Sequence, residues 1–351
     1  MNVKNTSALF HVNQVLLFLL LLFTLLYWGS SFLIPLALGS LLAMLLAPFT
    51  RQLERWKFPR LLASLVSVLL TVSIIITIFS ILINQLILLG RDLGSLEDRL
   101  PTMLENVYIY ISDTFELSKE QQEGYLKNQL SLAAGGITNF ATLLLRSLGG
   151  YLVNFMIVVT YSILLLLYRG RLKNFIIRLV RVQSKEGVGE ATHIVEKTTQ
   201  VASSYIAGIF IVVLILSVVN TAALYFIGIK HALFFGLLAG LLNLIPYIGS
   251  VMGSVFPVLY ALLTHDTASA AFIAGIYFFV IQNVESYILT PNIAGAKVDL
   301  SPLATIFALL LGGFIWGVAG MVVFVPLLGI AKVVFDNVDE LHPYGYLIST
   351  R

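Results

Sequence analysis

The chain contains no cysteine, and charged residues make up only 11% of its 351 positions. The lack of cysteine excludes a disulfide framework and metal sites built from thiolates. A soluble protein of this length would carry about a quarter charged residues, so the low charge excludes a globular enzyme with a single membrane anchor. Long unbroken apolar runs favour helices over a barrel, whose strands are short and alternate polar with apolar positions. We therefore expect an all-α, polytopic helical membrane protein.

Motifs that carry catalysis are also missing from the sequence. There is no H-E-x-x-H zinc motif, nucleophile elbow, Walker loop or dinucleotide fingerprint. The histidines are scattered without the spacing of metal ligands: His11, His193, His231, His265 and His342. These absences argue against an enzyme, a bound cofactor or metal, and the use of ATP by this chain alone.

Apolar runs and charged segments predict about eight transmembrane spans, arranged in six regions. The regions are N-terminal spans (1–90), an extracytoplasmic amphipathic helical region (91–136), a fourth span (137–168), basic cytoplasmic amphipathic helices (169–205), a C-terminal core with broken helices (206–335) and a cytoplasmic tail (336–351).

The first region predicts a helical hairpin, 15–28 and 32–49, followed by a third span at 61–89. Each arm of the hairpin is near the length of about 20 residues that a helix needs to cross the hydrocarbon. The third span is long enough to tilt or to project beyond the bilayer. We read the first segment as an uncleaved span, because Tyr27-Trp28 is a poor cleavage site for a signal peptide. Basic residues between the second and third spans place that loop in the cytoplasm: Arg51, Arg55, Lys57 and Arg60.

Acidic residues predominate in the region 91–136, which suits the outer side of the membrane. Its apolar positions are spaced alternately by three and four, as in a heptad seam: Leu93, Leu96, Leu100, Met103, Val107 and Tyr110. One interpretation is an amphipathic helix on the protein's own outer surface, and the other is a helix that packs against neighbouring subunits. The region 169–205 is basic and amphipathic, so we expect it in the headgroup plane of an anionic lipid leaflet rather than on nucleic acid.

In the C-terminal half, two long apolar segments are interrupted by proline and glycine. If 231–263 and 303–335 each cross once, the chain has eight spans; if each re-enters, it has six spans and two hairpins. Both termini are cytoplasmic in either arrangement, but residues 264–267 are cytoplasmic in the first and external in the second. The predicted helix breaks are Pro246, Gly249, Pro291, Gly295 and Pro302. Carbonyls freed at such breaks can bind ions and polar solutes, although many prolines only kink a membrane helix.

Glu285 is the only acidic residue within an apolar span. An ionised carboxylate is costly at that depth, so Glu285 could take up and release a proton during transport. Gln282 lies on nearly the same helix face, and Asn283 forms an adjacent polar stripe with Tyr287. The alternative is that Glu285 lies near the interface or makes a hydrogen bond between packed helices.

Further polar residues lie near the breaks. Asn243 either belongs to the cluster around Glu285 or caps a broken helix. Asn292 and Ser301 are either ligands or caps, and proline after Ser301 favours the cap. Asn220 is expected to join helices by a hydrogen bond. The predicted substrate or ion pathway consists of Glu285, Gln282, Asn283, Asn243, Asn292 and Ser301.

The C-terminal motifs resemble those of the autoinducer-2 exporter family of bacterial membrane proteins. The residues that carry the resemblance are Pro246-Tyr-Ile-Gly249, Gln282 to Glu285, Tyr287 to Gly295, Leu300 to Pro302, Gly312-Gly313, Gly317, Gly320 and Pro326. The resemblance implies a bacterial inner-membrane permease that exports autoinducer-2 or, as in some members, exchanges sodium for protons. It also implies a homo-oligomer, with a pentamer as one form.

We therefore expect a secondary transporter that is driven by an ion gradient and moves a small polar solute or cation, with transported Na⁺ or H⁺ as the coupling ion. Two alternatives are a passive pore and a non-transporting scaffold that organises envelope partners. Uphill flux driven by an imposed pH or sodium gradient would separate the transporter from both.

Overall fold

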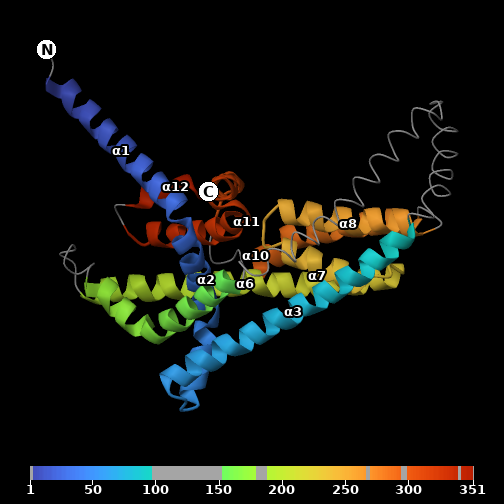
Figure 1. Cartoon of the computed structure of the whole chain (residues 1–351). Coiled ribbons are helices and arrows are strands. Elements are labelled where there is room, and N and C mark those ends of the chain that lie inside the picture. Colours follow the sequence, from blue (N-terminus) through green and yellow to red (C-terminus); the bar gives the residue numbers. More distant parts are fainter. Residues whose placement is uncertain are drawn as a thin grey trace. The chain divides into compact units, whose positions relative to one another are not determined.

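The structure is a computed structural model that describes residues 3–96, 152–178, 188–265, 269–293, 299–338 and 341–350. In these ranges every regular element is a helix (Figure 1). Six of the described helices are long and apolar enough to cross a membrane: Ser30–Arg55, Arg60–Gly90, Leu152–Arg178, Val195–Ile227, Ser269–Leu289 and Pro302–Phe335. Shorter apolar helices accompany them. The prediction of an all-α, polytopic membrane protein is confirmed. Most of the predicted seam from Leu93 to Tyr110 lies outside the described residues.

The first two helices do not form the predicted hairpin. Helix α1 (Val3–Trp28) and helix α2 (Ser30–Arg55) meet at Gly29, where the chain bends without reversing (Figure 1). The N–H of Gly29 donates to the Leu25 carbonyl, and the N–H of Leu33 donates to the Gly29 carbonyl, both at 2.8 Å. The helical hydrogen-bond ladder therefore continues through the predicted turn. A reversal would have required a loop that interrupts this ladder.

Helix α3 (Arg60–Leu96) follows a true reversal after α2. Lys57 adopts a positive φ of 66°, and the N–H of Phe58 bonds back to the Leu53 carbonyl at 3.2 Å. Such left-handed residues commonly end helices. Helix α3 runs beyond the predicted end of the third span, and the helix Leu152–Arg178 continues past Tyr168 into the basic segment. Arginine and lysine are good helix formers, so the charge changes along the helix while the helix itself continues.

Helices α7 (Ala232–Leu242) and α8 (Ile248–Thr264) form an antiparallel pair. A Cβ built on Gly249 would lie 1.7 Å from the Leu242 carbonyl oxygen, and one on Gly253 would lie 2.9 Å from Cα of Ala239. Farther along, the rings of Phe235 and Tyr260 are 5.1 Å apart. Each helix is shorter than the about 20 residues that cross the hydrocarbon. This geometry favours the hairpin over a single crossing for this segment.

Helix α11 (Pro302–Phe335) also folds back on itself, at Gly317. That residue has φ 60° and ψ −142°, a conformation that is close to the region open only to glycine. A Cβ on Gly320 would lie 1.9 Å from the Gly312 carbonyl oxygen, and the rings of Trp316 and Phe324 are 5.2 Å apart. The two arms therefore touch along a glycine-lined contact, as the predicted interruptions of this segment suggested.

Contacts divide the chain into two compact units, 1–71 with 154–212 and 288–351, and 72–153 with 213–287. The first unit contains α11 and the short helix α12 (His342–Leu347). Its buried core consists of Leu41, Tyr205, Ile206, Ile315, Trp316, Val323 and Val333. The second unit contains α7, α8, the C-terminal part of α6 (Val188–Ile227) and helix α9 (Ser269–Val284). Its buried core includes Leu89, Leu224, Phe235, Tyr260, Ala274 and Phe278.

Candidate functional site

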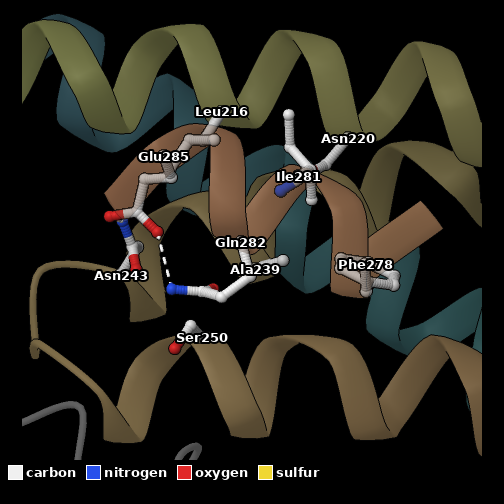
Figure 2. A pocket seen from close by; sticks show the side chains of 9 residues that line it. All are labelled: Leu216, Asn220, Ala239, Asn243, Ser250, Phe278, Ile281, Gln282 and Glu285. Atoms are coloured by element: carbon white, nitrogen blue, oxygen red, sulfur yellow. Dashed lines mark hydrogen bonds between the residues drawn. The ribbon is translucent and has the colours of Figure 1, made fainter. Parts of the chain in front are cut away.

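A small polar cavity lies inside the second unit, where α6, α7, α8 and α9 converge (Figure 2). Its volume is about 20 Å³, which is enough for about one water molecule. Apolar side chains form part of its wall, and amides, a hydroxyl and one carboxylate form the rest. The lining residues are Leu216, Asn220, Ala239, Asn243, Ser250, Phe278, Ile281, Gln282 and Glu285.

Glu285 is held by two amide groups at one side of this cavity. Asn243 Nδ2 donates to Glu285 Oε1 at 2.8 Å, and Gln282 Nε2 donates to Glu285 Oε2 at 3.0 Å. Figure 2 shows the three side chains converging. An ionised carboxylate only accepts hydrogen bonds, so two amide NH₂ groups complement its charged form. Hydrogen bonds to a charged partner are roughly twice as strong as neutral ones. The three residues therefore form one electrostatically matched group.

Asn243 reaches Glu285 from the tip of the α7–α8 hairpin, where it caps the C-terminus of α7. The connection then contains Pro246 and Tyr247, whose φ of 64° and ψ of −53° are unusual for a residue with a side chain. The N–H of Ile248 donates to the Pro246 carbonyl at 2.7 Å. These features define a γ-turn with positive φ, which is rare and strained. Strained backbone of this kind tends to cluster at functional sites.

Glu285 begins a second irregular element, the π-helix η1 (Glu285–Leu289), directly after α9. Single π-helical turns are rare and are frequently found at functional sites. The wider turn interrupts the polar stripe that the sequence suggested for Asn283 and Tyr287. Asn283 is exposed and donates to the Phe279 carbonyl of its own helix at 2.6 Å, and the side chain of Tyr287 is 79% exposed. Neither residue lines the cavity.

Tyr277 belongs to the same polar group but was not singled out from the sequence. Its hydroxyl donates to Asn220 Oδ1 at 2.7 Å. Asn220 is 4% exposed and lines the cavity, so this bond joins α6 to α9 as expected for Asn220 and also orients an amide in the cavity wall. The spacing of eight residues between Tyr277 and Glu285 does not place them on one helix face, so the sequence offered no clear signal for Tyr277.

The other predicted residues lie elsewhere. Asn292 is exposed on α10 (Thr290–Ile293), which also contains Pro291 and belongs to the first unit. Ser301 caps α11, because its hydroxyl accepts a hydrogen bond from the Ala304 N–H at 3.2 Å, and Pro302 is the first helical residue. Gly295 lies outside the described residues. Among those that are described, no three His, Cys, Asp or Glu side chains gather into a possible metal site.

The amino-acid sequence that produces these breaks and polar contacts is similar to a known family. The model of the AI-2E family transporters matches residues 16–340. The chain belongs to this family. The resemblance noted in the sequence is thereby confirmed.

The relatives of this AI-2E family member differ in how much of the chain they match. The AI-2 transport protein TqsA of Escherichia coli is 25% identical over 328 residues, which cover 92% of this chain and 90% of TqsA. Two Bacillus subtilis relatives are presumed transport proteins whose names state no solute. YueF is 23% identical over 89% of this chain and 85% of its own length, and YrrI is 35% identical over 37% of this chain and 36% of its own length. These relatives support transport as the class of function.

Proposed function

We propose that this AI-2E family protein is a secondary transporter of the bacterial cytoplasmic membrane and that Glu285 couples transport to an ion gradient. One observation carries the proposal. The carboxylate of Glu285 is bound through both oxygens by Asn243 and Gln282 and lines a polar cavity. Glu285 begins a π-helix, and Asn243 precedes the strained turn at Tyr247. A carboxylate inside an apolar segment is expensive to maintain and usually serves a substrate or ion pathway.

Protonation of Glu285 would change what its neighbours can bond to. A neutral carboxyl group carries a donor that the NH₂ group of Asn243 or Gln282 cannot accept. One of the two amides then has to rotate or move away. Asn243 lies at the tip of a hairpin whose connection contains a strained turn at Tyr247. Loss of the hydrogen bond between Asn243 and Glu285 would therefore release the hairpin tip and allow it to move. In this mechanism the proton on Glu285 selects between two positions of the α7–α8 tip.

The dimensions of the cavity bear on the transported species. A volume of about 20 Å³ suits one water molecule or a small cation bound by amide and carboxylate oxygens. A larger polar solute, such as the autoinducer-2 named for TqsA, would need a more open conformation. We therefore assign Na⁺ or H⁺ to this cavity as the coupling ion. The cargo is a small polar solute such as autoinducer-2, or the exchanged cation itself.

The test is flux in proteoliposomes that contain the purified full chain. The expected result is uphill movement of autoinducer-2 or Na⁺ when a pH or sodium gradient is imposed. Flux that only follows the solute's own gradient would indicate a passive pore. If no flux occurs, and if recovery of envelope partners survives changes to the Glu285 group but not to residues 91–136, the chain is a scaffold.

A further inference from the structure

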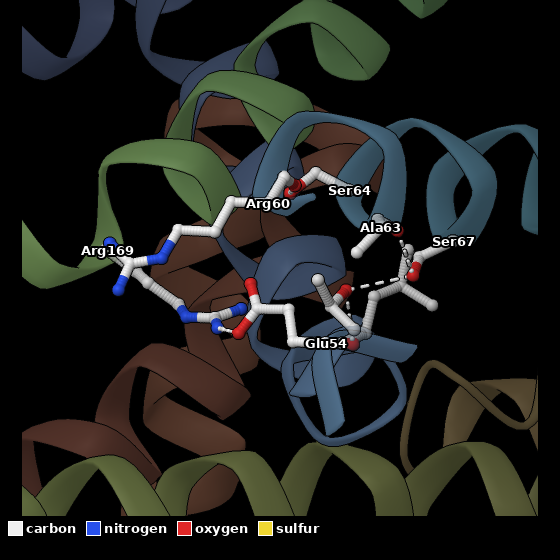
Figure 3. Close-up of polar contacts among 8 residues, drawn as sticks. Glu54, Arg60, Ala63, Ser64, Ser67 and Arg169 are labelled. Atoms are coloured by element: carbon white, nitrogen blue, oxygen red, sulfur yellow. Dashed lines mark hydrogen bonds and ion pairs between the residues drawn. The ribbon is translucent and has the colours of Figure 1, made fainter. Parts of the chain in front are cut away.

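A second polar cluster lies in the first unit, far along the sequence from the Glu285 group. Glu54 in the last turn of α2 forms an ion pair with Arg169 of the helix Leu152–Arg178. Both side chains are largely buried, with 22% and 26% of their surface exposed. Arg60 begins α3, and its side chain extends toward the helix that carries Arg169 (Figure 3). The cluster thus contains one ion pair, between Glu54 and Arg169, and a second arginine whose side chain lies beside it.

The charges of this cluster are not balanced by the residues around it. Arg169 Nη2 binds Glu54, but Arg169 Nη1 is buried and has no hydrogen-bond partner in the described part of the chain. A buried donor without a partner is unfavourable, and more so when it is charged. The first turn of α3 adds Arg60 and contains no acidic residue, and helix N-termini already carry partial positive charge. Among the residues that the structure describes, this cluster therefore has one carboxylate for two arginines and carries a net positive charge.

The surroundings indicate which anion fits. The candidate span Ser30–Arg55 ends at this cluster and the span Arg60–Gly90 begins there, while Arg169 lies nine residues before the end of Leu152–Arg178. The cluster therefore lies near the ends of apolar helices. Three residues close to the cluster in the sequence are exposed aromatics, namely Trp56, Phe58 and Tyr168, and such residues are typical of the membrane interface. Leu61 and Leu62, which follow Arg60, are about half exposed. A ligand for this site therefore meets guanidinium groups at one end and apolar side chains at the other.

We propose that Arg60 and Arg169 bind the phosphate of an anionic phospholipid, whose acyl chains lie along Leu61 and Leu62 of α3. Guanidinium groups bind phosphate with two parallel hydrogen bonds, and Nη1 of Arg169 supplies a donor that no described residue uses. Glu54 lowers the net positive charge of the cluster, so that the site takes one phosphate group rather than several. This role is independent of transport through the cavity at Glu285.

The experiment is native mass spectrometry of the purified full chain, titrated with phosphatidylglycerol and with phosphatidylcholine of the same acyl chains. We expect tighter binding of phosphatidylglycerol. Arg60→Gln should weaken its binding about tenfold, as expected for a lost hydrogen bond to a charged group. Arg60 is exposed, so this variant should fold. Arg178→Gln is the matched control, because it removes an exposed basic residue from the helix of Arg169, and it should leave binding unchanged.

Glu54→Gln provides a test with the opposite sign. If the cluster binds an anion, removal of the carboxylate should preserve or strengthen the binding of phosphatidylglycerol. Weaker binding in Glu54→Gln, or equal binding in Arg60→Gln and the parent protein, would overturn the proposal. Equal affinity for phosphatidylcholine would also overturn it. If millimolar inorganic phosphate displaces the lipid completely, the site binds soluble phosphate and the lipid assignment is wrong.

Discussion

Asn243 and Glu285 are joined by a hydrogen bond of 2.8 Å although 42 positions separate them in the sequence. Each lies where regular α-helix gives way to another conformation. Asn243 ends α7 just before the γ-turn at Tyr247, and Glu285 begins the π-helix η1. The bond therefore connects the tip of the α7–α8 hairpin to the irregular turn that follows α9.

The substitution Glu285→Gln tests this connection directly. Glutamine keeps the size of the side chain but replaces one accepting oxygen with a donor, so one of the two amide bonds is lost and no proton can be carried. We expect gradient-driven flux in proteoliposomes to fall to the background while the elution volume of the purified protein stays unchanged. Asn283→Ala is the control, because Asn283 is exposed and bonds only within its own helix among the bonds described. Unchanged flux in Glu285→Gln would remove Glu285 from the mechanism.

Tyr277→Phe removes only the hydroxyl that binds Asn220. Hydrogen bonds between membrane helices contribute about 0.6 kcal/mol on average, so we expect a small decrease in apparent Tm. The transport rate should fall more clearly, because Asn220 then loses the partner that orients its amide in the cavity wall. Tyr287→Phe is a matched control, since the ring of Tyr287 is exposed. If both variants transport at the parent rate, the bond to Asn220 only joins helices.

The close approach of Gly320 to Gly312 inside α11 can be tested by alanine substitutions at glycines. Alanine at Gly320 would place its Cβ 1.9 Å from the Gly312 carbonyl oxygen, and the backbone would have to shift. We expect Gly320→Ala to destabilise the protein by about 3 kcal/mol, as overpacked sites do. Alanine at Gly275 of α9 meets no atom within 4 Å, so the higher helix propensity of alanine should leave stability equal or raise it by about 0.5–1 kcal/mol. Thermal melting followed by size-exclusion chromatography would compare the two, and similar melting would contradict the folded-back arrangement.

The C-terminal segment should detach only in strong acid. Hydrogen bonds from Thr350 and Ser349 lower the pKa of Asp299 below its ordinary value of 3.8. A lowered pKa in the folded state means that the ionised carboxylate stabilises this contact above the ordinary pKa, and that the contribution is lost as the pH falls through the lowered value. The protection factors for hydrogen exchange at residues 344–350, which correct for the intrinsic pH dependence of exchange, should therefore be similar at pH 5 and pH 7 and smaller below pH 3.8.

Asp299→Asn should reproduce the acid behaviour at neutral pH, because it removes the charge that accepts these bonds. The Ser301 N–H donates to the Ile348 carbonyl at 2.9 Å, so it should lose protection together with the segment. Exchange in Asp299→Asn that matches the parent protein at pH 7 would show that the carboxylate does not hold the segment.

Several features of the site followed from residue type and spacing. A single carboxylate in an apolar run, with Gln282 on nearly the same helix face, indicated Glu285 as a site residue. Proline and glycine in the apolar segments indicated where helices break, and α7–α8 and α11 do break there. The low charge and the long apolar runs were sufficient to predict an all-α membrane protein. In lipid, a helix satisfies all the backbone hydrogen bonds of such a run within the run itself.

Other features depended on tertiary structure. The sequence Gly29-Ser30-Ser31 is compatible with a turn, yet the chain only bends there, because the dihedral angles of Gly29 keep the hydrogen-bond ladder intact. Asn283 lies on the exposed side of α9 and donates to the Phe279 carbonyl rather than to the cavity. Tyr277 joins the polar group because packing brings α9 against α6. Sequence determined where polar groups and breaks occur along the chain. Only packing decided which of them meet, because burial forces polar groups from distant segments to satisfy one another's hydrogen bonds.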